Sequence, residues 1–85
     1  MRSFAHVIAD REGLHARSCI VLVHEAAKWQ SAIEVSCGEA EADGRSLSSL
    51  LSLHARRGDA LVVSCSGPDE AEAALAREAL MRMSI

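Results

Sequence analysis

Two side chains near residue 15 have the types and the spacing that handling a phosphoryl group would need. His15 stands between a glycine turn and the start of a helical pattern, in the run Gly13-Leu14-His15-Ala16-Arg17. The first N–H groups of a helix have no internal partners and carry partial positive charge, so they stabilise an anion. Arg17 adds a guanidinium suited to bidentate phosphate contact. We therefore predict that His15 accepts a phosphoryl group and that Arg17 stabilises it; the alternative is a surface histidine that caps a helix.

The elements that must position these residues follow from hydrophobic periodicity. Alternation predicts strands over 3–9, 32–37, 39–43 and 60–66. A helical period predicts helices from 16 to about 29, from 47 to about 51 behind the N-cap Ser46, and from about 68 to 83. Proline at the first position of the last helix, followed by acidic residues, suits the positive end of its dipole.

The order β-α-β-β-α-β-α predicts an α+β sandwich with two layers, in which helices pack on one face of an antiparallel or mixed sheet. At 85 residues the chain is expected to form one domain, 1–85. The inward residues are predicted from the same periodicities. They are Cys19, Val23, Ala26 and Ala27 in the first helix, Ala40 and Ala42 in the third strand, and Ala73, Ala76, Leu80 and Met83 in the last helix.

Composition excludes several function classes. Apolar residues make up 49% and charged residues 25%, as in a globular domain. The net charge of −3 and the 2% of aromatic residues argue against a nucleic-acid partner, which needs basic and stacking side chains. An odd number of widely spaced cysteines (3) indicates a reducing compartment, and no signal peptide or membrane-spanning run is evident, so a cytoplasmic location is expected.

The other candidate residues predict no further chemistry. His6, His24 and His54 form no pair with metal-ligand spacing, and no two cysteines form a C-x-x-C unit. Cys19 lies on an apolar stripe and is expected to be a small core residue. No metal site and no cofactor are therefore expected.

The run Gly13–Arg17 resembles the active-site motif of HPr, the histidine-containing phosphocarrier family of the phosphoenolpyruvate-dependent sugar phosphotransferase system. Ser46-Leu47, Gly58 and Gly67 also fall where that family has them, and the resemblance covers essentially the whole chain. It implies an open-faced sandwich with three helices over a four-stranded antiparallel sheet. It also implies that His15 accepts phosphate from Enzyme I through Nδ1 and passes it to IIA domains, as a carrier without turnover of its own.

The resemblance extends to regulation and docking. Ser46 is similar to the serine that HPr kinase phosphorylates in many bacteria, although a plain N-cap serine is the alternative. Leu47 and Leu51 are expected to form an apolar docking patch for protein partners. The chain is expected to be a monomer that does not insert into membranes.

Four residues depart from the family pattern. Ser18 replaces a proline and could add a hydrogen-bond donor, while Glu12 brings a carboxylate that opposes the phosphate unless it turns away. Ser48 replaces a large apolar docking residue. Arg77 lies where the last helix usually buries an apolar residue, which leaves the register of that helix open.

Two other functions therefore stay open on the same scaffold. One is a regulatory binding module, for which phosphorylation would be a signal; the loss of the hydrophobic residue at position 48 favours it. The other is a nitrogen-related phosphotransferase paralogue with the same chemistry and a regulatory output. The presence of both His15 and Arg17 favours the carrier, because a pure scaffold needs no acceptor.

Overall fold

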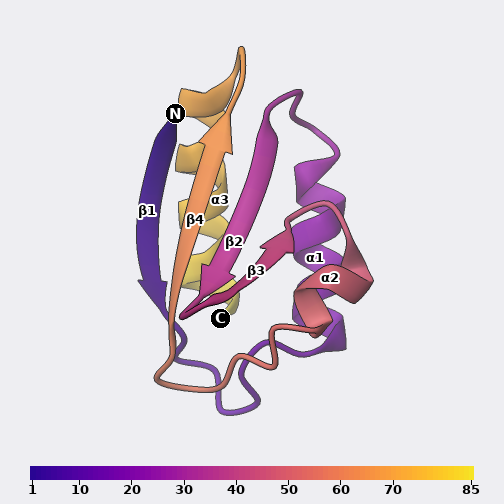
Figure 1. The fold of residues 1–85 in the computed structure, drawn as a ribbon, viewed down its shortest axis with the longest axis vertical. Coiled ribbons are helices and arrows are strands. Elements are labelled where there is room, and N and C mark those ends of the chain that lie inside the picture. Colours follow the sequence, from indigo (N-terminus) through magenta and orange to yellow (C-terminus); the bar gives the residue numbers. More distant parts are fainter.

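Four strands form one antiparallel sheet, and three helices cover one of its faces (Figure 1). The computed structural model describes residues 1–85. Its elements in chain order are β1 Arg2–Val7, α1 Ala16–Ala26, β2 Ala32–Cys37, β3 Ala40–Asp43, α2 Leu47–Leu51, β4 Ala60–Ser66 and α3 Glu70–Ser84. This order and this architecture confirm the predicted fold class. Of the antiparallel and mixed sheets left open by the sequence, the sheet is antiparallel.

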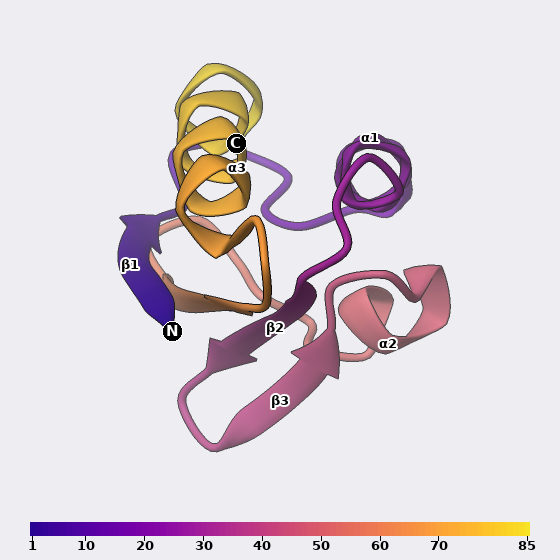
Figure 2. The ribbon, with the colours of Figure 1, turned by 90° about the horizontal axis from the view of Figure 1, so that it is seen from above.

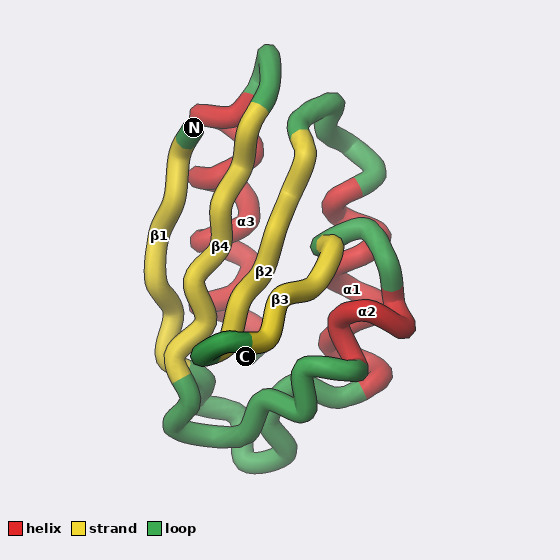
Figure 3. Tube along the Cα trace, viewed as in Figure 1, coloured by secondary structure: helices red, strands yellow, loops and turns green.

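The strands lie in the order β1-β4-β2-β3, so the last strand in the sequence is inserted between the first and the second (Figure 3). Seen from above, α1 and α3 lie side by side over the sheet, while α2 packs beside β3 and α1 (Figure 2). The sheet register places Val35 and Phe4 on either side of Val63. Val35 and Val63 are buried beneath the helices, as the alternating pattern requires.

Two elements end earlier than predicted because their backbone groups find partners elsewhere. β1 stops at Val7: the N–H of Ile8 still donates in register to the carbonyl of Asp59 at 3.0 Å, but the carbonyl of Ile8 accepts the N–H of Gly58 at 2.8 Å, one residue out of register. α1 stops at Ala26, and the N–H of Trp29 closes a tight turn on that residue's carbonyl at 3.2 Å. Turns of this i+3 type commonly finish a helix.

The buried side of α1 differs in part from the predicted stripe. Cys19 and Ala26 are buried and Val23 is partly buried, as expected, but Ala27 is exposed and Leu22 is buried. α1 packs against both α2 and α3, so its covered arc is wider than a single stripe and is centred nearer Leu22. Ala27 is the C-cap, one step of about 100° beyond that arc.

The strand β3 is covered at one end only. Ala42 is buried, whereas Ala40 is exposed, so the prediction that both point inward is half wrong. Ala40 pairs with Cys37 next to the Gly38 turn, at the free end of an edge hairpin. Alternation gives the two alanines the same face, but α2 packs on only part of this short strand.

The last helix is rotated relative to the prediction. Its fully buried residues are Ala73, Arg77 and Met81, while Met83 is 87% exposed. Of the predicted stripe, Ala73 is buried and Ala76 and Leu80 are only partly buried. The helix also begins later than expected: Asp69 is its N-cap, so Pro68 precedes the helix and does not occupy its first position.

Arg77 determines that rotation, because its guanidinium is accommodated in the core between α1 and α3. Its side chain is 0% exposed, and Nε lies 3.1 Å from Oε1 of Glu25. Nη2 donates to the carbonyl of Leu22 at 3.0 Å, and the indole N–H of Trp29 donates to Oε2 of Glu25. A buried charge is tolerated when it is paired and hydrogen-bonded. The ion pair between Arg77 and Glu25 therefore explains why α3 buries an arginine, and it fixes which side of α3 faces the core.

Candidate functional site

His15 occupies the N-cap of α1, where the chain passes from an extended backbone (φ −121°, ψ 177°) into the helix. Its carbonyl accepts the N–H of Cys19 at 2.9 Å, which is the first bond of the helical ladder. The N–H groups of Ala16, Arg17 and Ser18 therefore have no acceptor within the helix. The His15 side chain is 21% exposed and stands beside this positive end.

The turn before His15 requires glycine. Gly13 has φ +68°, a left-handed conformation that L side chains rarely adopt. A Cβ atom there would lie 2.5 Å from the carbonyl oxygen of Ala55. That same carbonyl accepts the N–H of Leu14 at 3.0 Å, and the Leu14 side chain is buried in the core. The residue next to His15 is thus anchored, and the turn is pinned to the loop that precedes β4.

Ser18 locks the N-cap in place. Its hydroxyl accepts the N–H of His15 at 3.1 Å and donates to the carbonyl of His15 at 3.0 Å. Ser18 is buried, so this hydroxyl replaces the rigidity that proline would supply. Of the two donors that serine has and proline lacks, the hydroxyl is not available to a phosphate, because its hydrogen is used within the turn.

A small hollow adjoins His15. Its volume is about 190 Å³. It is lined by Asp10, His15, Arg17, Ser18, Val21 and Ser84. Arg17 is exposed, so its guanidinium can reach a group held at the helix N-terminus. The structure thus brings together the two residues that the sequence analysis selected.

Two carboxylates also converge on His15. Oδ2 of Asp10 and Oε2 of Glu12 each lie 3.5 Å from its Nε2 atom. Oδ1 of Asp10 accepts the N–H of Glu12 at 2.9 Å. This hydrogen bond is the main reason that the pKa of the Asp10 carboxyl lies below its usual value; burial opposes it, and the nearby His15 adds to the lowering. The Glu12 carboxylate lies on the Nε2 side of the ring, which agrees with the alternative that its side chain turns away from a phosphoryl group on Nδ1.

The cluster was not predicted from the sequence, because its donors are two carboxylates and a single histidine and not a pair of histidines or cysteines. The ligating atoms of Asp10, Glu12 and His15 lie within 4.8 Å of one another. Nitrogen and carboxylate donors of this kind are among those that zinc accepts. The loop spacing Asp-x-Glu-x-x-His is the signal that could have drawn attention to them.

The residues predicted for docking and regulation lie on α2, which packs against α1. Ser46 is the N-cap, and its hydroxyl accepts the N–H of Ser49 at 3.3 Å, which confirms its capping role. Leu47 is 37% exposed. Leu51 is partly buried against the core, so the two leucines are not equally available. Ser48 is exposed.

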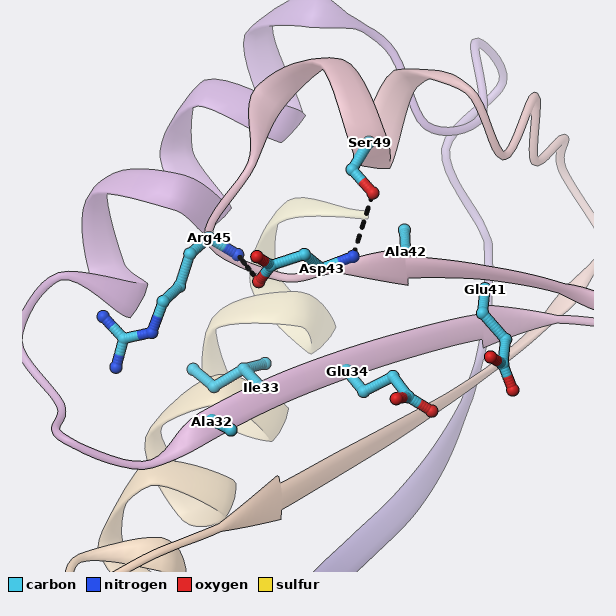
Figure 4. A pocket seen from close by; sticks show the side chains of 8 residues that line it. All are labelled: Ala32, Ile33, Glu34, Glu41, Ala42, Asp43, Arg45 and Ser49. Carbon is cyan, nitrogen blue, oxygen red and sulfur yellow. Dashed lines mark hydrogen bonds between the residues drawn. The ribbon is translucent and has the colours of Figure 1, made fainter.

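The largest hollow of the molecule lies elsewhere and is a poor site for an anion. It has a volume of about 460 Å³ near the ends of β2 and β3, below α2 (Figure 4). Carboxylates of Glu34, Glu41 and Asp43 line it. Its one cationic side chain, Arg45, points away from Glu34 and Glu41 and donates to the carbonyl of Ser31 at 2.7 Å. His24 lies on α1 and His54 in the loop after α2; both are exposed, and neither lines the hollow beside His15.

The comparisons with known proteins agree on one family. The family model described as the phosphorylation site of the HPr component of the phosphotransferase system matches residues 3–83. The chain belongs to the HPr family. No helix is long and apolar enough to span a bilayer.

Two relatives match this chain nearly end to end, and a third matches part of it. The phosphocarrier protein HPr of Mycoplasma genitalium is 35% identical over 82 residues, which is 95% of this chain and 93% of that protein. The crystal structure of an HPr from Thermoanaerobacter tengcongensis superposes with a TM-score of 0.93 at 30% identity, covering 99% of this chain and 94% of that one. A multiphosphoryl transfer protein of Xanthomonas campestris is 39% identical over 66 residues, or 78% of this chain and 8% of its own length.

Proposed function

We propose that this HPr-family chain is a phosphocarrier that receives a phosphoryl group from Enzyme I on Nδ1 of His15 and passes it to IIA domains. The observation that carries the proposal is the position of His15 at the N-cap of α1. There its ring lies beside the N–H groups of the first turn, which have no backbone acceptor within the helix, with Arg17 at the same hollow. These are the donors that a phosphoryl group needs.

The chemistry requires no turnover by this chain. The lone pair of Nδ1 attacks the phosphorus of the phosphorylated donor, the donor–phosphorus bond breaks, and an Nδ1–phosphorus bond forms. The N–H groups of the first helical turn and the Arg17 guanidinium then offset the charge on the phosphoryl oxygens. The reverse sequence delivers the group to the acceptor domain. A cytoplasmic, monomeric carrier without a cofactor is consistent with this role.

The test is phosphorylation in a purified system with phosphoenolpyruvate, Enzyme I and the wild-type chain. We expect one phosphoryl adduct that is labile in acid and stable in base, and no adduct on a His15→Ala variant. A His24→Ala variant is the matched control, since His24 is exposed on the same helix and lies outside the hollow. Phosphate that persists on His15→Ala would refute the assignment.

A regulatory role remains the second candidate because Ser48 exposes a hydroxyl where the family usually presents an apolar docking side chain. Addition of a sugar-specific IIA domain and, separately, a nitrogen-related IIA domain distinguishes the functions. Rapid transfer to the first supports the sugar carrier, and transfer only to the second supports the paralogue. Phosphorylation without transfer to either supports a signalling module.

A further inference from the structure

The carboxylates of Asp10 and Glu12 approach the ring nitrogen of His15 that is not the proposed acceptor. Both lie 3.5 Å from Nε2. That distance is longer than a good hydrogen bond, but contacts of this kind at reactive groups often tighten only when the partner is bound. A carboxylate has no hydrogen to donate when ionised, so each of these groups can only accept a proton from the ring.

A neutral imidazole carries its hydrogen on one of two nitrogens, and the partner of one nitrogen determines the state of the other. An acceptor beside Nε2 favours the Nε2–H tautomer and leaves the lone pair on Nδ1. We propose that Asp10 is a positioning residue for His15: its carboxylate selects the tautomer and the ring orientation that make Nδ1 the acceptor. This inference rests on the proposed function of His15 and adds a specific residue to it.

Asp10 is better prepared for this role than Glu12. Its Oδ1 atom is held by the N–H of Glu12 at 2.9 Å, which aims Oδ2 at the ring, and its side chain is 28% exposed. Glu12 is 68% exposed and has one more rotatable bond, so it loses more conformational freedom on making the same contact. We therefore expect the effect of removing Asp10 to exceed that of removing Glu12.

The same carboxylate stabilises the product of transfer. When Nδ1 bonds to phosphorus, the ring becomes positively charged while its Nε2 hydrogen stays in place, so no proton has to leave. Asp10 and Glu12 face that cation from the Nε2 side, and Arg17 faces the phosphoryl oxygens from α1. From α3, Ser84 lines the hollow without a charge. The negative groups thus lie by the nitrogen that turns away from the phosphoryl group.

An Asp10→Asn variant tests the proposal directly. Its amide oxygen can keep the hydrogen bond from the Glu12 N–H, and its NH₂ group then points at Nε2 as a donor. A donor in this place favours the opposite tautomer, with hydrogen on Nδ1 and no lone pair there. The corresponding change in a Ser-His-Asp triad preserves geometry, stabilises the wrong tautomer and costs about 10⁴-fold in rate.

The first measurement is the ¹⁵N NMR spectrum of the His15 ring, taken without Enzyme I, with a chelator present, and at a pH where imidazole is uncharged. We expect mainly Nε2–H in the wild type and a shift of the tautomer ratio by at least tenfold toward Nδ1–H in Asp10→Asn. Glu12→Gln is expected to shift the ratio by less. Glu39→Gln, which removes an exposed carboxylate in the β2–β3 turn, is the control and is expected to leave the ratio unchanged.

The second measurement is the rate of phosphorylation by Enzyme I, which we expect to fall at least tenfold in Asp10→Asn and to stay unchanged in Glu39→Gln. An unchanged tautomer ratio in Asp10→Asn would overturn the proposal, and so would a changed ratio with a wild-type rate. An Asp10→Glu variant that recovers both readouts supports a role of the carboxylate itself. If the wild type accepts no phosphate, the proposed function fails while the tautomer measurement still reports on Asp10.

Discussion

Single residues at the start of α1 are arranged for charge and not for packing. Arg17 and Glu12 are exposed, and His15 is only partly covered. Ser18 is the exception, because its hydroxyl is used by the His15 backbone. Substitutions of the exposed residues should therefore separate chemistry from stability.

Replacing Arg17 by alanine should slow phosphoryl transfer at least tenfold, which corresponds to about 1.4 kcal/mol of lost charge stabilisation. The free energy of unfolding should change by no more than about 0.5 kcal/mol, since the side chain is exposed and a cation near a helix N-terminus adds little stability. Transfer assays and urea unfolding on the same preparation check both statements. Equal transfer rates would mean that the helix N–H groups suffice without the guanidinium.

Ser46 offers a test of electrostatics at the docking face. An aspartate can accept the Ser49 N–H as serine does, so Ser46→Asp should fold normally. Its phosphorylation by Enzyme I should slow, because negative charge is added beside a surface that must meet an acidic partner. The defect should shrink above about 0.15 M salt, where the Debye length is roughly 8 Å.

The neutral variant Ser46→Asn keeps the cap and is the matched control for that experiment. It should react at the wild-type rate at every salt concentration. If Ser46→Asp is slowed equally at low and at high salt, the effect is steric or conformational, and the charge argument fails.

At the scale of elements, the two candidate docking leucines of α2 differ in exposure, so only one of them is available to a partner. Leu47 is partly exposed, while Leu51 packs against the apolar core cluster. Leu47→Ala should weaken binding to Enzyme I about tenfold and leave the melting temperature unchanged, since an interfacial leucine contributes roughly 1.5–3 kcal/mol at most. Leu51→Ala should lower the free energy of unfolding by about 1–2 kcal/mol, less than a fully buried leucine.

Leu75→Ala is the control for that pair. Leu75 is 70% exposed on α3 and lines a separate hollow between α3 and β1. It should change neither binding nor stability. Binding isotherms and thermal unfolding of all three variants separate a loss of binding from a loss of stability. A loss of stability in Leu47→Ala with unchanged binding would place the docking surface elsewhere.

At the scale of the whole molecule, the ion pair of Arg77 with Glu25 connects the two long helices. Small domains are stable by only about 5 kcal/mol, so one buried charge without its partner threatens the fold. Arg77→Met leaves Glu25 buried and uncompensated, and it should cost about 3–5 kcal/mol.

The double variant Glu25→Gln with Arg77→Met should recover at least half of that loss, because the neutral amide can still accept the indole N–H of Trp29. Urea midpoints for the wild type, both single variants and the double variant form the cycle that measures the coupling. If Arg77→Met costs less than about 1 kcal/mol, the ion pair does not hold the helices in register.

The sequence by itself determined the local elements and the acceptor motif. Period-two and period-3.6 patterns place all the strands and helices in order, and the bounds of β2 and β4 agree to the residue. The N-cap positions of His15 and Ser46 also followed from the sequence, because a cap depends on neighbours within about one turn. These interactions are short in range, so a local reading captures them.

Only the tertiary structure decided which side of a helix is buried and which distant groups meet. The sequence does not explain an arginine at a buried position of α3. In the structure the charge of Arg77 is paired with Glu25, which lies far away in sequence. Ala27 and Ala40 have small apolar side chains yet are exposed, since no neighbouring element covers the ends where they lie. Asp10 reaches His15 through the shape of the Gly13 turn, which Ala55 restricts from another loop. Burial and charge pairing depend on neighbours from other parts of the chain, and a periodic pattern carries no information about those neighbours.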